Sequence, residues 1–178
     1  MRYILLPLLL CACESSVTQP FKIPSYPRYL KTADAFVGMT ETEDRQTLSE
    51  FLKVDPVQYE WCAAFVNASL YVNDIPGSES VNDFPLMARS FLFWGESVEE
   101  PKLGDIVIFP RGNEGWQGHV GFYINTTVVD NESFYVILGG NQDDSVSYAL
   151  YPANKAIDIR RLDNPDTPDI RQKSTIDL

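Results

Sequence analysis

The chain divides into a helical first half and a strand-rich second half, and this order constrains its fold more than any other feature. Apolar residues at helical spacing predict helices in the first half, one of them apolar on almost every side. Short β-branched and aromatic runs separated by turn signals predict strands in the second half. The predicted helices cover 31–39, 42–54 (with Thr42 as N-cap), 61–72 and 86–94, and the predicted strands cover 104–109, 119–124, 134–138, 146–151 and 156–162. Helices followed by strands indicate an α+β fold with an antiparallel sheet.

Length and charge narrow the class of protein. The chain has 178 residues, which favours one domain with a substantial core. Its 25 acidic residues outnumber the 14 basic ones, for a net charge of −11. Nucleic-acid binding is not expected, because phosphate contact needs a basic footprint. No apolar run reaches the roughly 18 residues of a membrane-spanning helix.

The N-terminal segment has the features of an export signal. Arg2 precedes a short apolar stretch that ends in Leu10-Cys11-Ala12-Cys13. This ending resembles a bacterial lipobox, in which cleavage precedes a cysteine that then carries lipid. An ordinary signal peptide and an apolar first strand are the alternatives. We therefore predict a signal peptide at 1–12, a proline-rich tether at 13–29 lipidated on Cys13, a folded domain at 30–162 and a polar tail at 163–178.

The residue after the predicted lipidation site bears on localisation. Glu14 follows Cys13, where Asp would favour retention at the inner membrane by resemblance to bacterial lipoproteins. We expect an exported bacterial or phage-encoded lipoprotein, anchored to a membrane and facing the periplasm. The outer membrane is favoured if the host has one.

A thiol, an imidazole and an amide form the candidate catalytic group. Cys62 begins the apolar helix at 61–72, where the helix dipole is expected to lower the pKa of a thiol. His119 begins a strand and shares a face with Gly121, which leaves room for a helix beside it. Asn141, at the end of the next strand, can accept the second imidazole N–H and complete a Cys-His-Asn arrangement. Taken singly, each has an ordinary structural alternative: a packing cysteine, a structural histidine and a turn asparagine.

The same residues lie in motifs that resemble NlpC-type cell-wall cysteine peptidases and the related CHAP amidases, in particular a phage and bacterial subfamily. Over about residues 30–162 the motifs are Trp61 to Asn67, Ala88-Arg89-Ser90 with Trp94-Gly95, Gly104 to Val107, Gly118 to Gly121, and Gly139 to Gln142. The resemblance implies a minimal papain-like fold, with a buried Cys-bearing helix packed on an antiparallel β-meander. It also implies Cys62 as nucleophile, His119 as base and Asn141 as the orienting residue. The neighbouring Gln142 leaves that third assignment open.

Other residues are candidates for substrate and oxyanion contacts. The backbone N–H of Cys62 is a natural oxyanion donor at a helix start, and the hydroxyl of Tyr59 is a second candidate. Trp116 is a candidate to line a groove for a glycan or a stem peptide, and Gln142 a candidate to contact the substrate. A packing role is the alternative for Tyr59 and Trp116. One histidine and one spare cysteine cannot supply the three protein ligands of a catalytic zinc, so neither metal nor cofactor is predicted.

These features together predict a cysteine hydrolase that cleaves an amide bond of peptidoglycan, as an endopeptidase or an N-acetylmuramoyl-L-alanine amidase. The expected partners are a stem peptide or a glycan–peptide junction, and a membrane through the N-terminal lipid. The alternative is a catalytically inactive papain-like lipoprotein that serves as a binding or structural module.

Overall fold

The computed structural model describes residues 26–162. The predicted signal peptide at 1–12, the lipidation site at Cys13 and the tail at 163–178 lie outside the described residues, as does most of the predicted tether. The end of that tether lies inside them, because α1 (Arg28–Asp34) begins there and the ring of Tyr29 is buried. The folded domain therefore begins before residue 30.

Helices occupy the first half of the described chain. After α1 come α2 (Arg45–Leu52), α3 (Cys62–Tyr71) and the 3₁₀ helices η1 (Ser78–Ser80) and η2 (Ala88–Phe93). The N-cap of α2 is Asp44 rather than the expected Thr42. Residues 86–94 form the tighter η2 instead of an α-helix. There the hydroxyl of Ser90 donates to the carbonyl of Phe84, a local side-chain bond that competes with regular helix.

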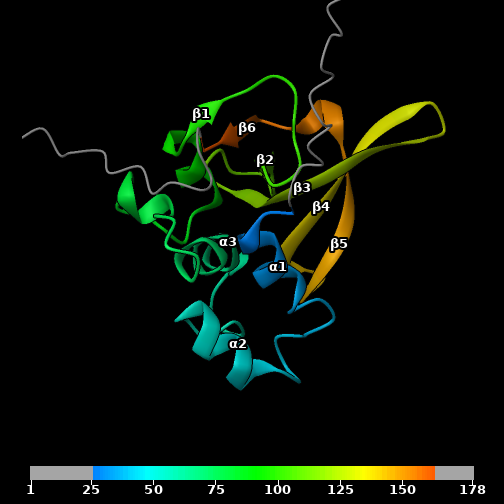
Figure 1. Cartoon of the computed structure of the whole chain (residues 1–178). Coiled ribbons are helices and arrows are strands. Elements are labelled where there is room, and N and C mark those ends of the chain that lie inside the picture. Colours follow the sequence, from blue (N-terminus) through cyan, green and yellow to red (C-terminus); the bar gives the residue numbers. More distant parts are fainter. Residues whose placement is uncertain (1–25, 163–178) are drawn as a thin grey trace, which may run out of the picture.

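The second half forms a sheet whose strand pairs are all antiparallel (Figure 1). Its strands lie in the order β1-β6-β2-β3-β4-β5. They are β1 (Glu96–Ser97), β2 (Ile106–Pro110), β3 (Gly118–Val129), β4 (Glu132–Gln142), β5 (Ser145–Pro152) and β6 (Asp158–Arg161), with η3 (Ala153–Lys155) between the last two. The predicted α+β class is therefore confirmed.

Two tight turns determine how β3, β4 and β5 follow one another. Asp130 and Asn131 join β3 to β4, and Asp143 and Asp144 join β4 to β5; all four have positive φ angles. Two-residue hairpin loops of this kind favour Asn and Asp, whose short polar side chains tolerate the left-handed region. The β3–β4 hairpin extends well past the rest of the sheet, at the right of Figure 1.

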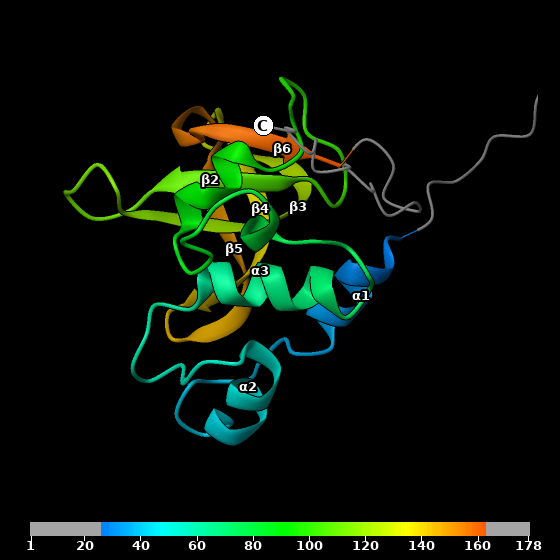
Figure 2. The same cartoon turned by 90° about the vertical axis from the view of Figure 1, so that its left-hand side faces the viewer.

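Helix α3 lies at the centre of the main core. It runs along one face of the sheet, with α2 on its far side (Figure 2). Seven of its ten residues are buried, which explains why its sequence is apolar on nearly every side. Val120 and Phe122 of β3 belong to this core. A smaller apolar cluster, including Phe109 and Ile137, covers the opposite face.

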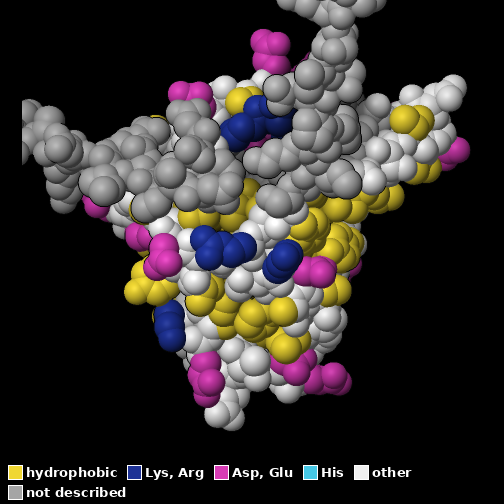
Figure 3. All heavy atoms as spheres, viewed as in Figure 1, with side chains coloured by type: hydrophobic (Ala, Val, Ile, Leu, Met, Phe, Trp, Pro, Cys, Tyr) yellow, Lys and Arg dark blue, Asp and Glu magenta, His cyan; other side chains and the backbone are white. Residues whose placement is uncertain are grey.

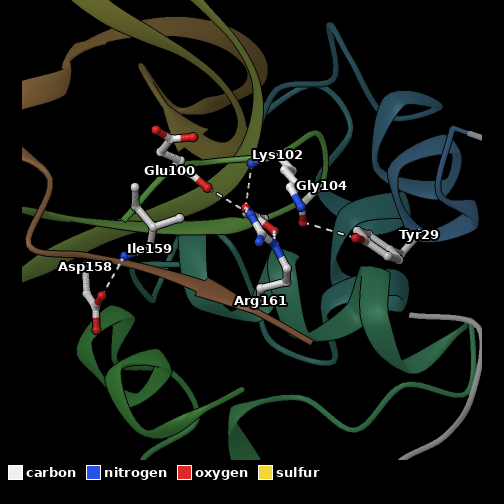
Figure 4. Close-up of polar contacts among 8 residues, drawn as sticks. Tyr29, Glu100, Lys102, Gly104, Asp158, Ile159 and Arg161 are labelled. Carbon is white, nitrogen blue, oxygen red and sulfur yellow. Dashed lines mark hydrogen bonds and ion pairs between the residues drawn. The ribbon is translucent and has the colours of Figure 1, made fainter. Parts of the chain in front are cut away.

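A partly buried ion pair joins the last strand to the segment before β2 (Figure 4). Arg161 donates through Nε and Nη2 to the two carboxylate oxygens of Asp105, at 2.8 and 2.6 Å. The backbone N–H of Lys102 donates to the same carboxylate, and the hydroxyl of Tyr29 donates to the adjacent carbonyl of Gly104. These bonds connect α1, the β2 segment and β6, so the two ends of the described chain are tied together.

Candidate active site

Cys62 is the first residue of α3 and is only 2% exposed. The pairing of β3 with β4 begins at Phe122, so the first residues of β3 have no partner in β4. In that interval the backbone of Val120 lies close enough to Cys62 to favour the thiolate and oppose the rise in the pKa of the thiol. The thiol therefore lies against the start of β3, next to the position that carries His119.

His119 is buried on the face of the sheet opposite α3, where it pairs directly with Phe109 of β2. Its imidazole stacks on the ring of Tyr151 with centroids 5.1 Å apart and an interplanar angle of 11°. Tyr151 in turn stacks on Phe109 at 4.6 Å. The expectation that a helix packs beside Gly121 is wrong, because the side chain of Ile137 from β4 fills that space.

Gln142 determines how the imidazole is oriented. Its Oε1 lies 3.2 Å from Nε2 of His119, while its Nε2 donates to the carbonyl of Ser147 at 2.6 Å and to that of Gly139 at 3.3 Å. Because the amide nitrogen is committed to carbonyl acceptors, the amide oxygen must face the imidazole. His119 therefore carries its proton on Nε2, and Nδ1 has the free lone pair.

Asn141, the residue expected to orient His119, points elsewhere. Its Nδ2 donates to Oε2 of Glu60 at 2.8 Å, and no hydrogen bond of the described structure joins it to His119. Its φ angle is 57°, and the β4–β5 register shifts between Gly139 and Gln142. A β-bulge adds one residue to one strand, so simple alternation assigns the following side chains to the wrong face. Gln142, not Asn141, consequently shares the face of His119.

Burial is the main cause of the pKa shifts of Cys62 and His119. It raises the pKa of the Cys62 thiol, an effect that the backbone of Val120 and the charge of Arg111 only partly offset. The expected low-pKa thiol is therefore not found, because burial outweighs the helix start. Burial, together with Arg111, lowers the pKa of His119 to about 4. At neutral pH the site holds a thiol and a neutral imidazole.

Nδ1 of His119 is the buried side-chain polar atom of the described residues that has no hydrogen-bond partner. Unsatisfied buried acceptors are costly and are concentrated at sites with a function. Two electrostatic effects place the thiol in the same part of the molecule. The backbone of Val120, one residue further along β3, influences the pKa of Cys62, and the charge of Cys62 influences the pKa of Tyr151, whose ring stacks on His119. The arrangement suits a base that accepts a proton at Nδ1.

An open groove with a volume of about 390 Å³ reaches the thiol. Its lining residues come from the start of α3, from the segment at the start of η2 and from the loop between β2 and β3. The start of α3 and this loop lie on the same side of the molecule, at the left of Figure 2. The lining residues are Glu60, Cys62, Leu86, Met87, Ala88, Arg111, Gly112, Trp116, Gln117 and Gly118. Trp116 lines the groove as expected, whereas Tyr59 is exposed and not among the lining residues.

Sequence reasoning missed three residues at this site. Arg111 and Glu60 line the groove and form an ion pair at 3.4 Å. Arg111 immediately follows β2 in an otherwise acidic chain, which was an available signal. Tyr151 lies 32 residues beyond His119 on a different strand, and nothing local in the sequence indicated its stacking.

The described residues contain no group of three or more His, Cys, Asp or Glu side chains that could hold a metal ion. Within the same range, none of the helices is long and apolar enough to cross a membrane.

A thiol at the start of the central helix and an imidazole on the adjoining antiparallel sheet define a small papain-like fold. Residues 54–141, just under half of the chain, match the family described as CHAP domain. CHAP domains are generally cysteine- and histidine-dependent amidohydrolases or peptidases, and at the family level they act on peptidoglycan. The matched range includes Cys62 and His119 and ends one residue before Gln142. No curated protein and no solved structure shows significant similarity to the chain.

Proposed function

We propose that this protein cleaves an amide bond of peptidoglycan by thiol chemistry, as an endopeptidase or an N-acetylmuramoyl-L-alanine amidase. Cys62 is the nucleophile, His119 the base and Gln142 the residue that positions the base. The observation that carries the proposal is the unpartnered Nδ1 of His119, whose ring is oriented by the bond from Nε2 to Gln142, in a domain whose buried Cys62 lines an open groove.

Proton transfer begins from the neutral pair. Nδ1 of His119 accepts the proton of the Cys62 thiol as the sulfur attacks the amide carbonyl. The imidazolium that forms is stabilised by Oε1 of Gln142, because a hydrogen bond from a charged donor is stronger than one from a neutral donor. The same contact raises the pKa of His119 and so opposes the effect of burial.

The remaining steps use the helix start and the same imidazole. The first N–H groups of α3 have no intrahelical acceptor, and the N–H of Cys62 is directed to the developing oxyanion. His119 then gives its proton from Nδ1 to the leaving amine, and a thioester remains on Cys62. Water activated by His119 hydrolyses the thioester and restores the thiol.

Digestion of purified peptidoglycan by the full-length protein tests this function. We expect mass spectrometry to show products with one new amino group and one new carboxyl group per cleavage, which also identifies the bond. Cys62→Ala should abolish their release. Tyr59→Phe is the matched control, because Tyr59 is exposed and lies outside the groove lining, and it should release products at the wild-type rate. A folded wild type that releases no product would support the inactive lipoprotein instead.

We also propose that the domain is anchored through a lipid on Cys13 and faces the periplasm, at the outer membrane if the host has one. The lipobox-like sequence and the proline-rich stretch after it support this. Intact-mass analysis of membrane-extracted protein should show loss of residues 1–12 and a diacylglycerol adduct. A retained Met1, or an unmodified Cys13 after cleavage, would contradict the proposal.

A further inference from the structure

Arg111 lies in the groove with most of its hydrogen-bonding capacity unused. It follows β2 at the start of the loop that leads to His119 and lines the groove together with Cys62. Its Nη1 lies 3.4 Å from Oε2 of Glu60, and its Nη2 donates to the carbonyl of Asn141 at 3.4 Å. Both contacts are long for hydrogen bonds of this type, and a guanidinium has five N–H donors. Several donors therefore remain for a bound molecule.

Glu60 pairs with the guanidinium of Arg111 and leaves it accessible from the groove. The same oxygen, Oε2, accepts from Nδ2 of Asn141 at 2.8 Å, which is the stronger of its two contacts. The side chain of Glu60 is 78% exposed and that of Arg111 43% exposed. Exposed ion pairs contribute little, so a second carboxylate can compete for Arg111 at small cost.

We propose that Arg111 anchors a carboxylate of the substrate, so that the groove selects peptides with a free carboxylate close to the scissile amide over the same peptides carrying a carboxamide. The reaction itself rests on the proposed function, whereas the binding preference can be measured without it. Arg111 presents a planar fork of N–H donors that matches a carboxylate in two-point contact.

The charges around the groove support an anion at this position. Among its lining residues Glu60 and Arg111 are the charged ones, and Arg111 also acts electrostatically on Cys62 and His119. The chain as a whole carries a net charge of −11. Figure 3 shows a different face of the molecule, on which basic side chains occur in small separate groups among apolar and acidic ones. A carboxylate that enters the groove therefore meets Arg111 as the basic side chain among the lining residues.

Peptidoglycan stem peptides provide a matched pair of ligands for this site. Their D-glutamate is linked through its side chain, which leaves an α-carboxylate that also occurs as a carboxamide. The two forms differ in charge at one position and have nearly the same shape. A preference between them measures the contact to Arg111 with little contribution from the rest of the groove.

The kinetic test compares kcat/KM for the acid and amide forms of one stem peptide at pH 8. We expect the wild type to prefer the acid by about tenfold or more, the size of a charge-assisted contact. Arg111→Gln should bring the ratio close to one, and Arg111→Lys should give an intermediate value. Taking the ratio cancels the influence of Arg111 on Cys62 and His119, because both substrates use the same catalytic pair. Arg45→Gln is the matched control, since Arg45 pairs with Asp55 away from the groove and its loss should leave the ratio at the wild-type value.

The Glu60→Gln variant tests whether Glu60 competes with the substrate carboxylate for Arg111. Removing the competing anion while keeping the amide shape should lower KM for the acid peptide, because Arg111 becomes free. A higher KM would mean that Glu60 binds a substrate ammonium instead, and a ratio near one in the wild type would overturn the proposal.

Calorimetric titration of the full-length Cys62→Ala variant with both peptides separates binding from chemistry. Tighter binding of the acid form, lost on adding Arg111→Gln, supports the carboxylate anchor even if the wild type proves to have no hydrolytic activity. Equal binding of the two forms, or binding of neither, overturns the anchor even where hydrolysis of peptidoglycan is observed. Failure of this inference and failure of the proposed function therefore give different results.

Discussion

Two neighbouring residues at the end of β4 belong to networks of opposite character. Gln142 is buried and joins His119 and Ser147 in what we call the inner network. Asn141 is joined to Glu60 and Arg111 in the outer network, whose charged side chains are exposed to the groove. The inner network positions the chemistry, and the outer one faces whatever enters the groove. The bulge between Gly139 and Gln142 directs the two adjacent side chains into different networks.

The difference in burial determines what each network contributes. A hydrogen bond in the inner network is formed away from water, so an unpaired partner there costs its full desolvation. The outer network is in contact with solvent, where ion pairs are screened and weak. Substitutions of the inner network should therefore change turnover and stability, and those of the outer network should change mainly substrate preference. The following predictions are ordered by the size of the expected effect.

The largest effect is expected for His119→Ala. This change removes the proton acceptor for attack and the proton donor for the leaving amine. Product release from peptidoglycan should fall by about 10²–10⁴-fold or more. Circular dichroism is the control for folding. Full activity in a folded His119→Ala variant would rule out the thiol mechanism.

The second largest effect is expected in the pH dependence of stability, through the buried His119. An unfolded histidine titrates near pH 6.5, whereas the pKa of folded His119 is lowered to about 4, chiefly by burial. Between these values the unfolded state binds more protons, so stability decreases as the pH falls. The loss is up to about 1.4 kcal/mol per pH unit, or about 3 kcal/mol over the window. It is absent above pH 6.5 and complete below pH 4.

Urea unfolding of the wild type and of His119→Gln at pH 7 and pH 5 measures this term. The wild type should lose more stability between the two values than the variant does. Equal losses in the two proteins would mean that other groups account for the acid sensitivity.

Gln142→Ala should have a smaller but clear effect on turnover. It leaves the base in place and removes the acceptor that holds Nε2–H of His119. If about 1–2 kcal/mol of orientation is lost at the transition state, kcat falls about 5- to 30-fold. The acid limb of the rate profile should also move to lower pH, because the contact with Gln142 raises the pKa of His119. A merely structural loss would lower the amount of folded protein without moving that limb.

Asn141→Ala should have the smallest effect on chemistry. It removes the bond to Glu60 and loosens the outer network, which is expected to change KM by no more than about fivefold and to leave kcat nearly intact. Steady-state kinetics on a stem peptide distinguishes the two parameters. A loss of kcat larger than that of Gln142→Ala would restore Asn141 as the positioning residue and reverse the comparison.

Much of the fold was predictable because it depends on local signals. The nearly all-apolar stretch at 61–72 predicted the buried helix, and Asp130-Asn131 predicted a turn. Cys62 and His119 were identifiable as candidates because the sequence offers few residues with that chemistry. The 3₁₀ form of η2 was not predictable, because its apolar spacing is the same as that of an α-helix. Polar bonds such as that of Ser90 to Phe84 decide between them.

By itself the sequence determined the order of helices and strands, the two-residue turns and the residue types available for nucleophile and base, since these follow from spacing, backbone preference and chemistry along the chain. Tertiary structure decided which amide meets the imidazole and which cation lines the groove. The bulge between Gly139 and Gln142 exists only in the pairing of β4 with β5, and it changes which face each later side chain occupies. Arg111, Glu60 and Asn141 meet because three distant segments converge at the start of α3. Contacts of that kind depend on how elements pack, and no local pattern in the sequence encodes them.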